Sequence, residues 1–404
     1  MKIAVFHNLP SGGGKRALYN NVNYLVKDHE VDVFVPSTAN EDYLPLKGIA
    51  DDLTVFPVKN NIIGFLISVI KPYFLYRVSL SDLEKTQKYM AEVVNKGDYD
   101  VVYCEQDRYT MAPFFLKYIN KPNVYYCNQS INFRNEVSKM LNEKAGLKHK
   151  DIMGTIHSKL YGNQMISTDK KYTNYSKYIV TNSYFSRELI LRSYGINSFV
   201  SYLGVDINLF KRYDVPEENF VLSVGQCLPE KGFDFIIKSL SKIDSTIRPE
   251  FVIVSDHAND LWRNHLKDLA AKLGVKLRIL SMIDDEELVL LYNKARLLVY
   301  APYLEPFGLV PLEAMSCGTP IVAVKEGGVR ESVINNKTGI LTERDEDYFA
   351  NAVVKLLENE DKRNEMSKNA YGNVNKFWTL DHAGKRFSEH LKHAINKYVD
   401  DVKK

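Results

Sequence analysis

Short apolar runs alternate with segments of helical periodicity along the whole chain. Compact runs rich in Val, Ile, Phe and Tyr indicate buried strands, whereas apolar positions three or four apart indicate helices. Strands are predicted at residues 3–6, 31–35, 101–104, 124–127, 178–181, 199–202, 220–224, 250–254, 277–280, 297–300, 321–324 and 340–341. Helices are predicted at residues 16–26, 83–95, 186–194, 233–240, 261–273, 286–294 and 348–359. Repeated strand–helix units of this kind are typical of α/β proteins with parallel sheets.

A polar, proline-containing stretch at residues 204–218 separates the predicted strands into two groups of about six. We therefore predict two Rossmann-like domains, one over residues 1–207 and one over residues 208–379. A last helical segment, about residues 380–404, follows the final strand–helix unit and has no strand of its own to cover. We expect this helix to cross back and pack on the N-terminal domain.

Composition places the chain among ordinary globular proteins, with 45% hydrophobic and 25% charged residues. The net charge of +3 hides an asymmetry, because residues 1–210 hold 25 basic and 20 acidic residues and the remainder holds 28 and 30. Residues 134–192 are the most basic part, with 11 basic and 5 acidic residues. This surplus is too small for a nucleic-acid partner but fits an anionic surface or substrate.

The four cysteines are far apart and form no CxxC pair, which favours reduced thiols in a reducing compartment. The N-terminal residues indicate a first strand rather than a signal peptide. No uninterrupted apolar run is long enough to span a membrane. We expect a cytoplasmic protein.

Residues 60–80, NNIIGFLISVIKPYFLYRVSL, combine an apolar run with aromatic and basic residues at its end. One interpretation is an interfacial segment that contacts a membrane surface, which would place the protein on the cytoplasmic membrane face. The other is an ordinary buried helix or loop in a large domain, and we favour it.

The stretch LLVYAPYLEPFGLVPLEAMSCG contains two carboxylates around a predicted helix start. A strand ends near residue 302, a helix begins near Gly308, and Pro311 is acceptable only in a first turn. Glu305 therefore lies in the loop and Glu313 about one turn into the helix. The first-turn amides belong to Phe307, Gly308, Leu309 and Val310. Such a helix start binds phosphate well, although the acids could simply complement the helix dipole.

A second informative stretch is VLSVGQCLPEKGF. The strand at 220–224 runs into Gly225, and Lys231 follows in the loop before the next helix. A lysine at the carboxyl end of a parallel strand can bind an anionic ligand, and the alternative is a solvated loop lysine.

Together, these stretches resemble the retaining family-four glycosyltransferases, which have the GT-B fold. EPFGLVPLE carries the E-x7-E spacing as Glu305 and Glu313, and AMSCGTPIVA and GGVRESVINNKTGIL follow it. VGQCLPEKG, VTNSYFSRELILRSYG, YLGVDINLF and the glycine loop PSGGGKR also fit, so the resemblance covers essentially the whole chain. It implies two Rossmann-like domains that face a central cleft.

The resemblance also implies roles for individual residues. Lys231, beside Gly225, would bind the diphosphate of a nucleotide-sugar, Glu305 the sugar hydroxyls and Glu313 the ribose hydroxyls. The amides of residues 307–310 would bind the distal phosphate and sugar. The implied remaining donor contacts are Gly13 and Gly14 of the glycine loop and, beside the base, Leu280, Ser281 and Met282. No metal or other cofactor is implied.

Two positions depart from the family pattern. Gln226 stands where the family usually has Arg, and Asn128 stands where related sequences often have a His that contacts the donor sugar. Asn can donate a hydrogen bond to a hydroxyl but cannot carry charge. Lys15 or Arg16 could substitute for the missing cation.

The resemblance implies transfer of a hexose from a nucleoside diphosphate sugar to a hydroxyl acceptor, either a glycan or a lipid-linked glycan. The leaving phosphate itself would take the acceptor proton in a same-face substitution. Gln226 and Asn128 keep a catalytically impaired nucleotide-sugar-binding protein open as an alternative. Another GT-B enzyme, such as a nucleotide-sugar epimerase, is a further alternative. The nucleobase, the sugar and the acceptor stay open.

Overall fold

The computed structural model describes residues 1–59, 79–130, 137, 141, 165–255 and 260–403. Residues 60–78 of the segment predicted at 60–80 lie outside the described residues, as do most of residues 134–164 of the basic stretch at 134–192. None of the helices in the described part of the chain is long and apolar enough to cross a membrane.

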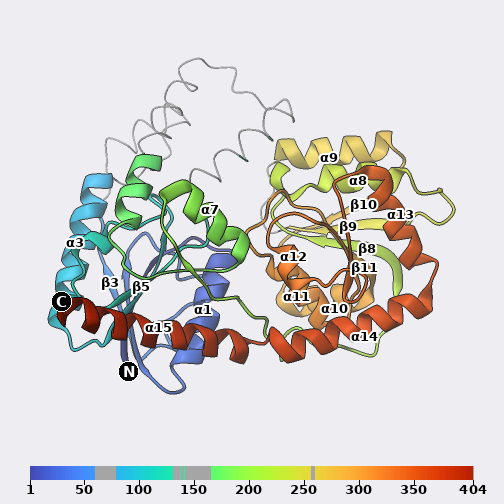
Figure 1. Ribbon diagram of the computed structural model, residues 1–404. Helices are drawn as coiled ribbons and strands as arrows, with labels where there is room; N and C mark the ends of the chain where they lie inside the picture. Colours follow the sequence, from blue (N-terminus) through green and yellow to red (C-terminus); the bar gives the residue numbers. More distant parts are fainter. Residues whose placement is uncertain (60–78, 131–136, 138–140, 142–164, 256–259, 404) are drawn as a thin grey trace, which may run out of the picture.

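Two parallel sheets form the two halves of the molecule (Figure 1). The first sheet has seven strands in the order β3-β2-β1-β4-β5-β6-β7, and the second has six in the order β10-β9-β8-β11-β12-β13. The first consists of β1 (Lys2–Asn8), β2 (Glu30–Pro36), β3 (Asp52–Phe56), β4 (Val101–Asp107), β5 (Asn123–Tyr126), β6 (Ile179–Thr181) and β7 (Phe199–Val200). The second consists of β8 (Glu218–Val224), β9 (Glu250–Val254), β10 (Leu277–Leu280), β11 (Ala295–Tyr300), β12 (Ile321–Val324) and β13 (Gly339–Thr342).

Helices cover both faces of each sheet, as parallel strands buried on both sides require. In the first domain they are α1 (Gly13–Leu25), α3 (Leu80–Lys96), α4 (Phe115–Tyr118) and α7 (Tyr184–Tyr194). In the second they are the 3₁₀ turn η1 (Pro229–Lys231), α8 (Phe233–Ser241), α9 (Asp260–Lys272), α10 (Asp285–Lys294), α11 (Leu309–Ser316), α12 (Val329–Ser332), α13 (Glu346–Leu357) and α14 (Glu360–Phe377). The last helix is α15 (Leu380–Lys403).

The structure confirms the predicted α/β class and contains every strand predicted above. It adds β3, an edge strand whose Thr54 and exposed Val55 break the apolar pattern on which the prediction rested. It also adds α14, whose buried positions include two polar residues, Arg363 and Ser367, beside the apolar Met366, Ala370 and Val374. Both elements are largely solvated, so hydrophobic periodicity marks them weakly.

The chain crosses between the domains twice, and the two crossings lie side by side. The amide of Val205 donates to the carbonyl of Trp378 at 2.8 Å, and the amide of Leu380 donates to Val205 at 3.2 Å. Gly204 is required here, because a Cβ would lie 2.4 Å from the Thr379 carbonyl oxygen.

The predicted return of the C-terminal helix is confirmed. α14 packs on α11 and α13 of the second domain, whereas α15 packs on α1, β4 and β5 of the first (Figure 1). The centroid of the Phe387 ring in α15 lies 4.4 Å from that of the Tyr103 ring in β4, and both side chains are buried. Burying an aromatic side chain of this size stabilises the contact by about 1.5–3 kcal/mol.

Candidate active site

The strand order of each sheet marks the point at which a ligand is expected to bind. The strand order reverses between β1 and β4 in the first sheet and between β8 and β11 in the second. Ligands of open parallel sheets bind outside the carboxyl ends of the strands at such points. The predicted site residues follow these strand ends, since Gly13 follows β1, Gly225 follows β8 and Glu305 follows β11.

Lys231 and Glu305 bind each other in the second domain. Nζ of Lys231 lies 2.6 Å from Oε2 of Glu305, although the residues are 74 positions apart in the sequence. The amide of Tyr303 donates to the carbonyl of Glu230 at 2.8 Å and ties the two loops together. Both side chains keep about a quarter of their exposure, so a ligand can reach the pair.

The loop that carries Glu305 is held by close backbone packing. Gly327 and Gly328 lie against it, and the amide of Gly328 donates to the Glu305 carbonyl at 2.8 Å. A Cβ would lie 2.2 Å from that oxygen at Gly327 and 2.3 Å from the Pro306 oxygen at Gly328. Leu304 adopts φ 51°, an uncommon conformation for a non-glycine residue, directly before Glu305. The glycine pair of the GGVRES stretch therefore shapes this loop.

Arg344, just after β13, supports the same loop. It binds both oxygens of Glu326 at 2.7 and 2.8 Å and donates to the carbonyls of Ala301 and Pro302. Its guanidinium also lies 3.7 Å from the ring centroid of Tyr303. Arg344 was not among the site residues predicted from the sequence.

The first turn of α11 follows Glu305 directly. Gly308 takes the N-cap position with φ 89°, and a Cβ there would lie 2.8 Å from the Tyr300 hydroxyl. The side chain of Phe307 is buried between the rings of Tyr202 and Trp378 near the domain crossings. Leu309 and Val310 are only partly buried, so the positive end of the helix macrodipole is close to the solvent side of the crevice.

Glu313 lies one turn further into α11 and is 7% exposed. The Tyr292 hydroxyl donates to its Oε2 at 2.8 Å. Burial raises the pKa of Glu313, and the positive charge of Arg16 opposes the rise.

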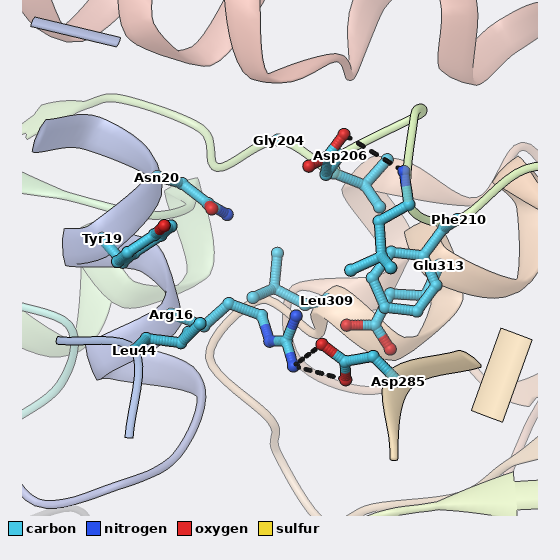
Figure 2. A pocket seen from close by; sticks show the side chains of 12 residues that line it. Arg16, Tyr19, Asn20, Leu44, Gly204, Asp206, Phe210, Asp285, Leu309 and Glu313 are labelled. Carbon is cyan, nitrogen blue, oxygen red and sulfur yellow. Dashed lines mark hydrogen bonds and ion pairs between the residues drawn. The ribbon is translucent and has the colours of Figure 1, made fainter. Parts of the chain in front are cut away.

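Arg16 reaches Glu313 from the other domain (Figure 2). Its Nη2 donates to both carboxylate oxygens of Asp285, at 2.9 and 3.2 Å, and its Nε donates to the Tyr43 hydroxyl at 3.2 Å. Burial alone would lower the pKa of Arg16, but Glu313 and Asp285 raise it. The guanidinium and both carboxylates border a cavity of about 260 Å³ between α1, the domain crossing and α11.

The glycine loop of the first domain leads into α1, which begins at Gly13. A Cβ at Gly13 would meet nothing within 4 Å, and one at Gly14 only the Leu9 side chain at 3.9 Å. Lys15 is fully buried and pairs with Glu41 beside the ring of His7. Of the two cations proposed as substitutes for the missing arginine, Arg16 therefore lies at the domain interface and Lys15 does not.

Asn128 follows β5 and is held by two first-domain side chains. Its Oδ1 accepts from Asn182 Nδ2 at 3.2 Å, and its Nδ2 lies 3.5 Å from Glu105 Oε2. Glu105 is fully buried beside the Tyr103 hydroxyl, and burial raises its pKa to about 8. Asn128 is thus oriented by a network that the sequence analysis did not anticipate.

The segment predicted to lie beside the base begins at the last residue of β10. Leu280 is partly buried, Ser281 and Met282 are exposed, and Met282 adopts φ 57°. Gln226 is exposed in the loop after β8. The structure shows no contact of these four residues with Lys231 or Glu305 among the interactions of the described residues.

Glu331 joins the two domains and was not a predicted site residue. Its carboxylate accepts from the amides of Tyr184 and Phe185, both at 2.9 Å, at the start of α7. It also accepts from the Tyr202 hydroxyl at 2.8 Å. Nearby, Ser183 donates to the Pro306 carbonyl at 2.5 Å, so the Glu305 loop contacts the first domain directly.

Part of the chain that carries this site is similar to known proteins. Residues 206–373 match the family described as "Glycosyl transferases group 1", and the matched range contains Lys231, Glu305 and Glu313. This range covers most of the second domain and less than half of the chain, so the similarity to the family concerns Lys231, Glu305 and Glu313 and not the site residues of the first domain. Among the described residues, no three His, Cys, Asp or Glu side chains gather in a way that could hold a metal ion.

Individual relatives agree with this similarity. The chain is 31% identical over 198 residues to a D-inositol 3-phosphate glycosyltransferase of Salinispora tropica, a match that covers 45% of this chain and 41% of the relative. A putative glycosyltransferase of Bacillus subtilis, YtcC, is 22% identical over 363 residues, which cover 82% of this chain and 87% of that protein. The chain thus spans about two fifths of the former relative and most of the latter.

Solved structures support the fold across the whole chain. The crystal structure of Anabaena HepE in complex with UDP and glucose aligns with a TM-score of 0.72 over 97% of this chain and 99% of that chain, at 20% identity. At this identity the likeness concerns the fold alone, and it confirms the predicted GT-B arrangement of two parallel-sheet domains.

Proposed function

We propose that the protein is a retaining glycosyltransferase that moves a hexose from a nucleoside diphosphate sugar to a hydroxyl acceptor. The observation that carries this proposal is the contact between Lys231 and Glu305 at the start of α11. One cation, one carboxylate and a helix start provide complementary groups for a diphosphate and for sugar hydroxyls at adjacent positions. HepE, which shares the fold, was crystallised in complex with UDP and glucose, and this supports a donor of the same chemistry.

In the proposed complex the diphosphate replaces Glu305 as the ion-pair partner of Lys231. Lys231 then neutralises the diphosphate together with the first-turn amides of α11, and Glu305 becomes free to accept hydrogen bonds from the sugar hydroxyls. Glu313 binds the ribose, the segment at residues 280–283 borders the base, and Asn128 contacts the sugar from the first domain. We propose that this arrangement works without a metal or other cofactor.

Transfer would proceed on one face of the sugar. The bond between the anomeric carbon and the phosphate oxygen breaks, the acceptor oxygen bonds to that carbon, and the phosphate takes the acceptor proton. Closure of the domains would exclude water from the oxocarbenium-like transition state. The direct contacts of Glu331 and Pro306 with the first domain provide surfaces on which the domains can close.

We propose that the acceptor, a glycan or lipid-linked glycan, enters over the first domain, whose basic surplus suits a negatively charged acceptor or membrane face. The proposal includes a cytoplasmic location with peripheral membrane contact. Sedimentation of the protein with anionic but not neutral liposomes would support this part. Recovery of all protein in the supernatant would contradict it.

The test of the reaction is release of free nucleoside diphosphate from UDP-, GDP- and ADP-sugars in the presence of candidate glycan acceptors. Release with formation of a glycosylated product supports the proposal. Binding without turnover would favour the impaired binding protein suggested by Gln226 and Asn128. Donor isomerisation without release would favour the epimerase alternative.

A further inference from the structure

The cavity between the domains contains an unusual pair of partly satisfied polar groups. Arg16 uses Nε and Nη2 for Tyr43 and Asp285, which leaves its Nη1 group without a hydrogen-bond partner in the described part of the structure. Glu313 uses Oε2 for Tyr292, and its Oε1 has no hydrogen-bond partner within the same residues. A buried carboxylate usually has its hydrogen-bonding capacity filled. Arg16 and Glu313 both line the cavity, so it is bordered by one free donor group and one free acceptor atom (Figure 2).

The charge of the cavity selects the kind of ligand. One guanidinium faces the carboxylates of Asp285 and Glu313, so the polar end of the cavity is negative overall. A phosphate would be repelled, whereas a hydroxyl can donate to a carboxylate and accept from a guanidinium at the same time. Two adjacent hydroxyls match one donor and one acceptor. The apolar side chains of Leu44, Leu209 and Leu309 line other parts of the cavity and suit the carbon face of a sugar.

We propose that Arg16 is a specificity-determining residue that binds the vicinal diol of the donor's ribose together with Glu313. This inference rests on the proposed function and deepens it. One hydroxyl donates to Oε1 of Glu313 and the other accepts from Nη1 of Arg16. Because Arg16 lies on α1 and Glu313 on α11, the nucleoside site is completed by the first domain. The vicinal diol of an acceptor sugar is chemically similar, and the test separates the two sources.

The test compares the affinities of UDP and 2′,3′-dideoxyuridine 5′-diphosphate, measured by calorimetry, with the GDP and ADP pairs run in parallel. The ribonucleotide that binds best defines the pair used for the variants. We expect wild-type protein to bind the ribonucleotide at least about tenfold more tightly, as loss of hydrogen bonds to charged groups implies. Equal affinity for the two forms would show that the diol is not the ribose and would overturn the proposal.

Arg16→Gln and Glu313→Gln each remove one of the two proposed hydrogen bonds, so each should lower the affinity ratio well below the wild-type value. Arg16→Lys keeps the positive charge but lacks the planar guanidinium, so its affinity ratio should lie between those of Arg16→Gln and the wild type. Asp285→Asn removes the ion pair but leaves Arg16 beside Glu313, so it should keep the wild-type ratio. Lys27→Ala is the matched control, because it removes an ion-paired cation, 3.1 Å from Asp381, close to the end of the same helix. It should change nothing.

Two outcomes contradict the inference while leaving the proposed function intact. Arg16→Gln could keep the wild-type ratio, or Asp285→Asn could lose it to the same extent, which would mean that Arg16 acts only through the ion pair. Failure of all three ribonucleotides to bind wild-type protein would contradict both proposals. Lys231→Met should weaken both members of a pair equally, because its partner is the diphosphate.

Discussion

The two halves of the Lys231–Glu305 pair should respond with opposite signs when nucleoside diphosphate binds. Lys231→Met removes the cation that is proposed to receive the diphosphate. Glu305→Gln removes the carboxylate that occupies the same cation at 2.6 Å in the ligand-free structure. If the diphosphate must displace Glu305, the first variant weakens binding and the second strengthens it.

The structure sets the size of both effects. A hydrogen bond to a charged group contributes about 1.5–3 kcal/mol, so Lys231→Met should raise the Kd about 10- to 150-fold. The side chains of the ion pair are 23% and 24% exposed, and a pair in contact with water contributes about 0.2–1 kcal/mol. Its removal by Glu305→Gln should therefore lower the Kd by a factor of up to about five. Both variants should lose sugar transfer.

Calorimetric titration of each variant with UDP, GDP and ADP measures these shifts, and thermal unfolding checks that the fold is intact. Lys238→Met is the control, because Lys238 pairs with Asp234 at 3.6 Å on the adjacent helix α8 without facing Glu305. Equal weakening by Lys231→Met and Glu305→Gln would refute the idea of displacement. An equal effect of Lys238→Met would show that only the general positive charge matters.

Three further predictions concern the scaffold. Gly232→Ala should lower the free energy of unfolding by about 2–5 kcal/mol in urea titrations, because Gly232 has φ 66° and a Cβ would lie 2.1 Å from the Ala301 oxygen. The control Gly372→Ala, in α14 where a Cβ meets nothing within 4 Å, should instead raise the free energy of unfolding by about 0.5–1 kcal/mol. Equal effects of the two variants would contradict the close packing of Gly232. Glu331→Ala should loosen the domain interface and increase the radius of gyration measured by solution scattering, with unchanged helix content. The control Glu343→Ala, at an exposed position, should leave the radius of gyration unchanged. An unchanged scattering curve for Glu331→Ala would contradict the bridging role of Glu331. Burial raises the pKa of Glu105 from 4.5 to about 8, so between these pH values Glu105 is protonated in the folded protein and ionised in the unfolded chain. The free energy of unfolding should therefore fall as the pH rises through this range, and it should fall less in Glu105→Gln between about pH 5 and pH 8. Parallel pH profiles of stability for the wild type and the variant would contradict the raised pKa of the buried acid.

Hydrophobic periodicity predicts most of this fold because parallel strands are apolar on both sides. β1 and β8 are nearly continuous apolar runs, and their burial in the structure follows directly. β3 and α14 escaped prediction because their exposed faces carry polar residues, so that the apolar signal is diluted. The strand–loop–helix order around Glu305 and Lys231 was readable for the same reason, since both follow strongly apolar strands.

The rest of the site depends on contacts between distant residues. Arg16 and Asp285 are 269 positions apart, and Glu331 reaches amides 146 and 147 positions away. Lys15 and Arg16 were equivalent candidates in the sequence, but consecutive helical residues differ by about 100° around the axis. That rotation buries Lys15 against Glu41 and turns Arg16 towards Glu313. Local patterns contain no information about which of the two faces the second domain.

We propose that the second domain binds a nucleoside diphosphate through Lys231 and the start of α11. A crystal structure with whichever of UDP, GDP and ADP binds best would show this contact. We expect a diphosphate oxygen about 3 Å from Lys231 Nζ, another about 3 Å from a first-turn amide of α11, and Glu305 released from Lys231. A nucleotide bound elsewhere, with the 2.6 Å contact between Lys231 and Glu305 intact, would contradict it.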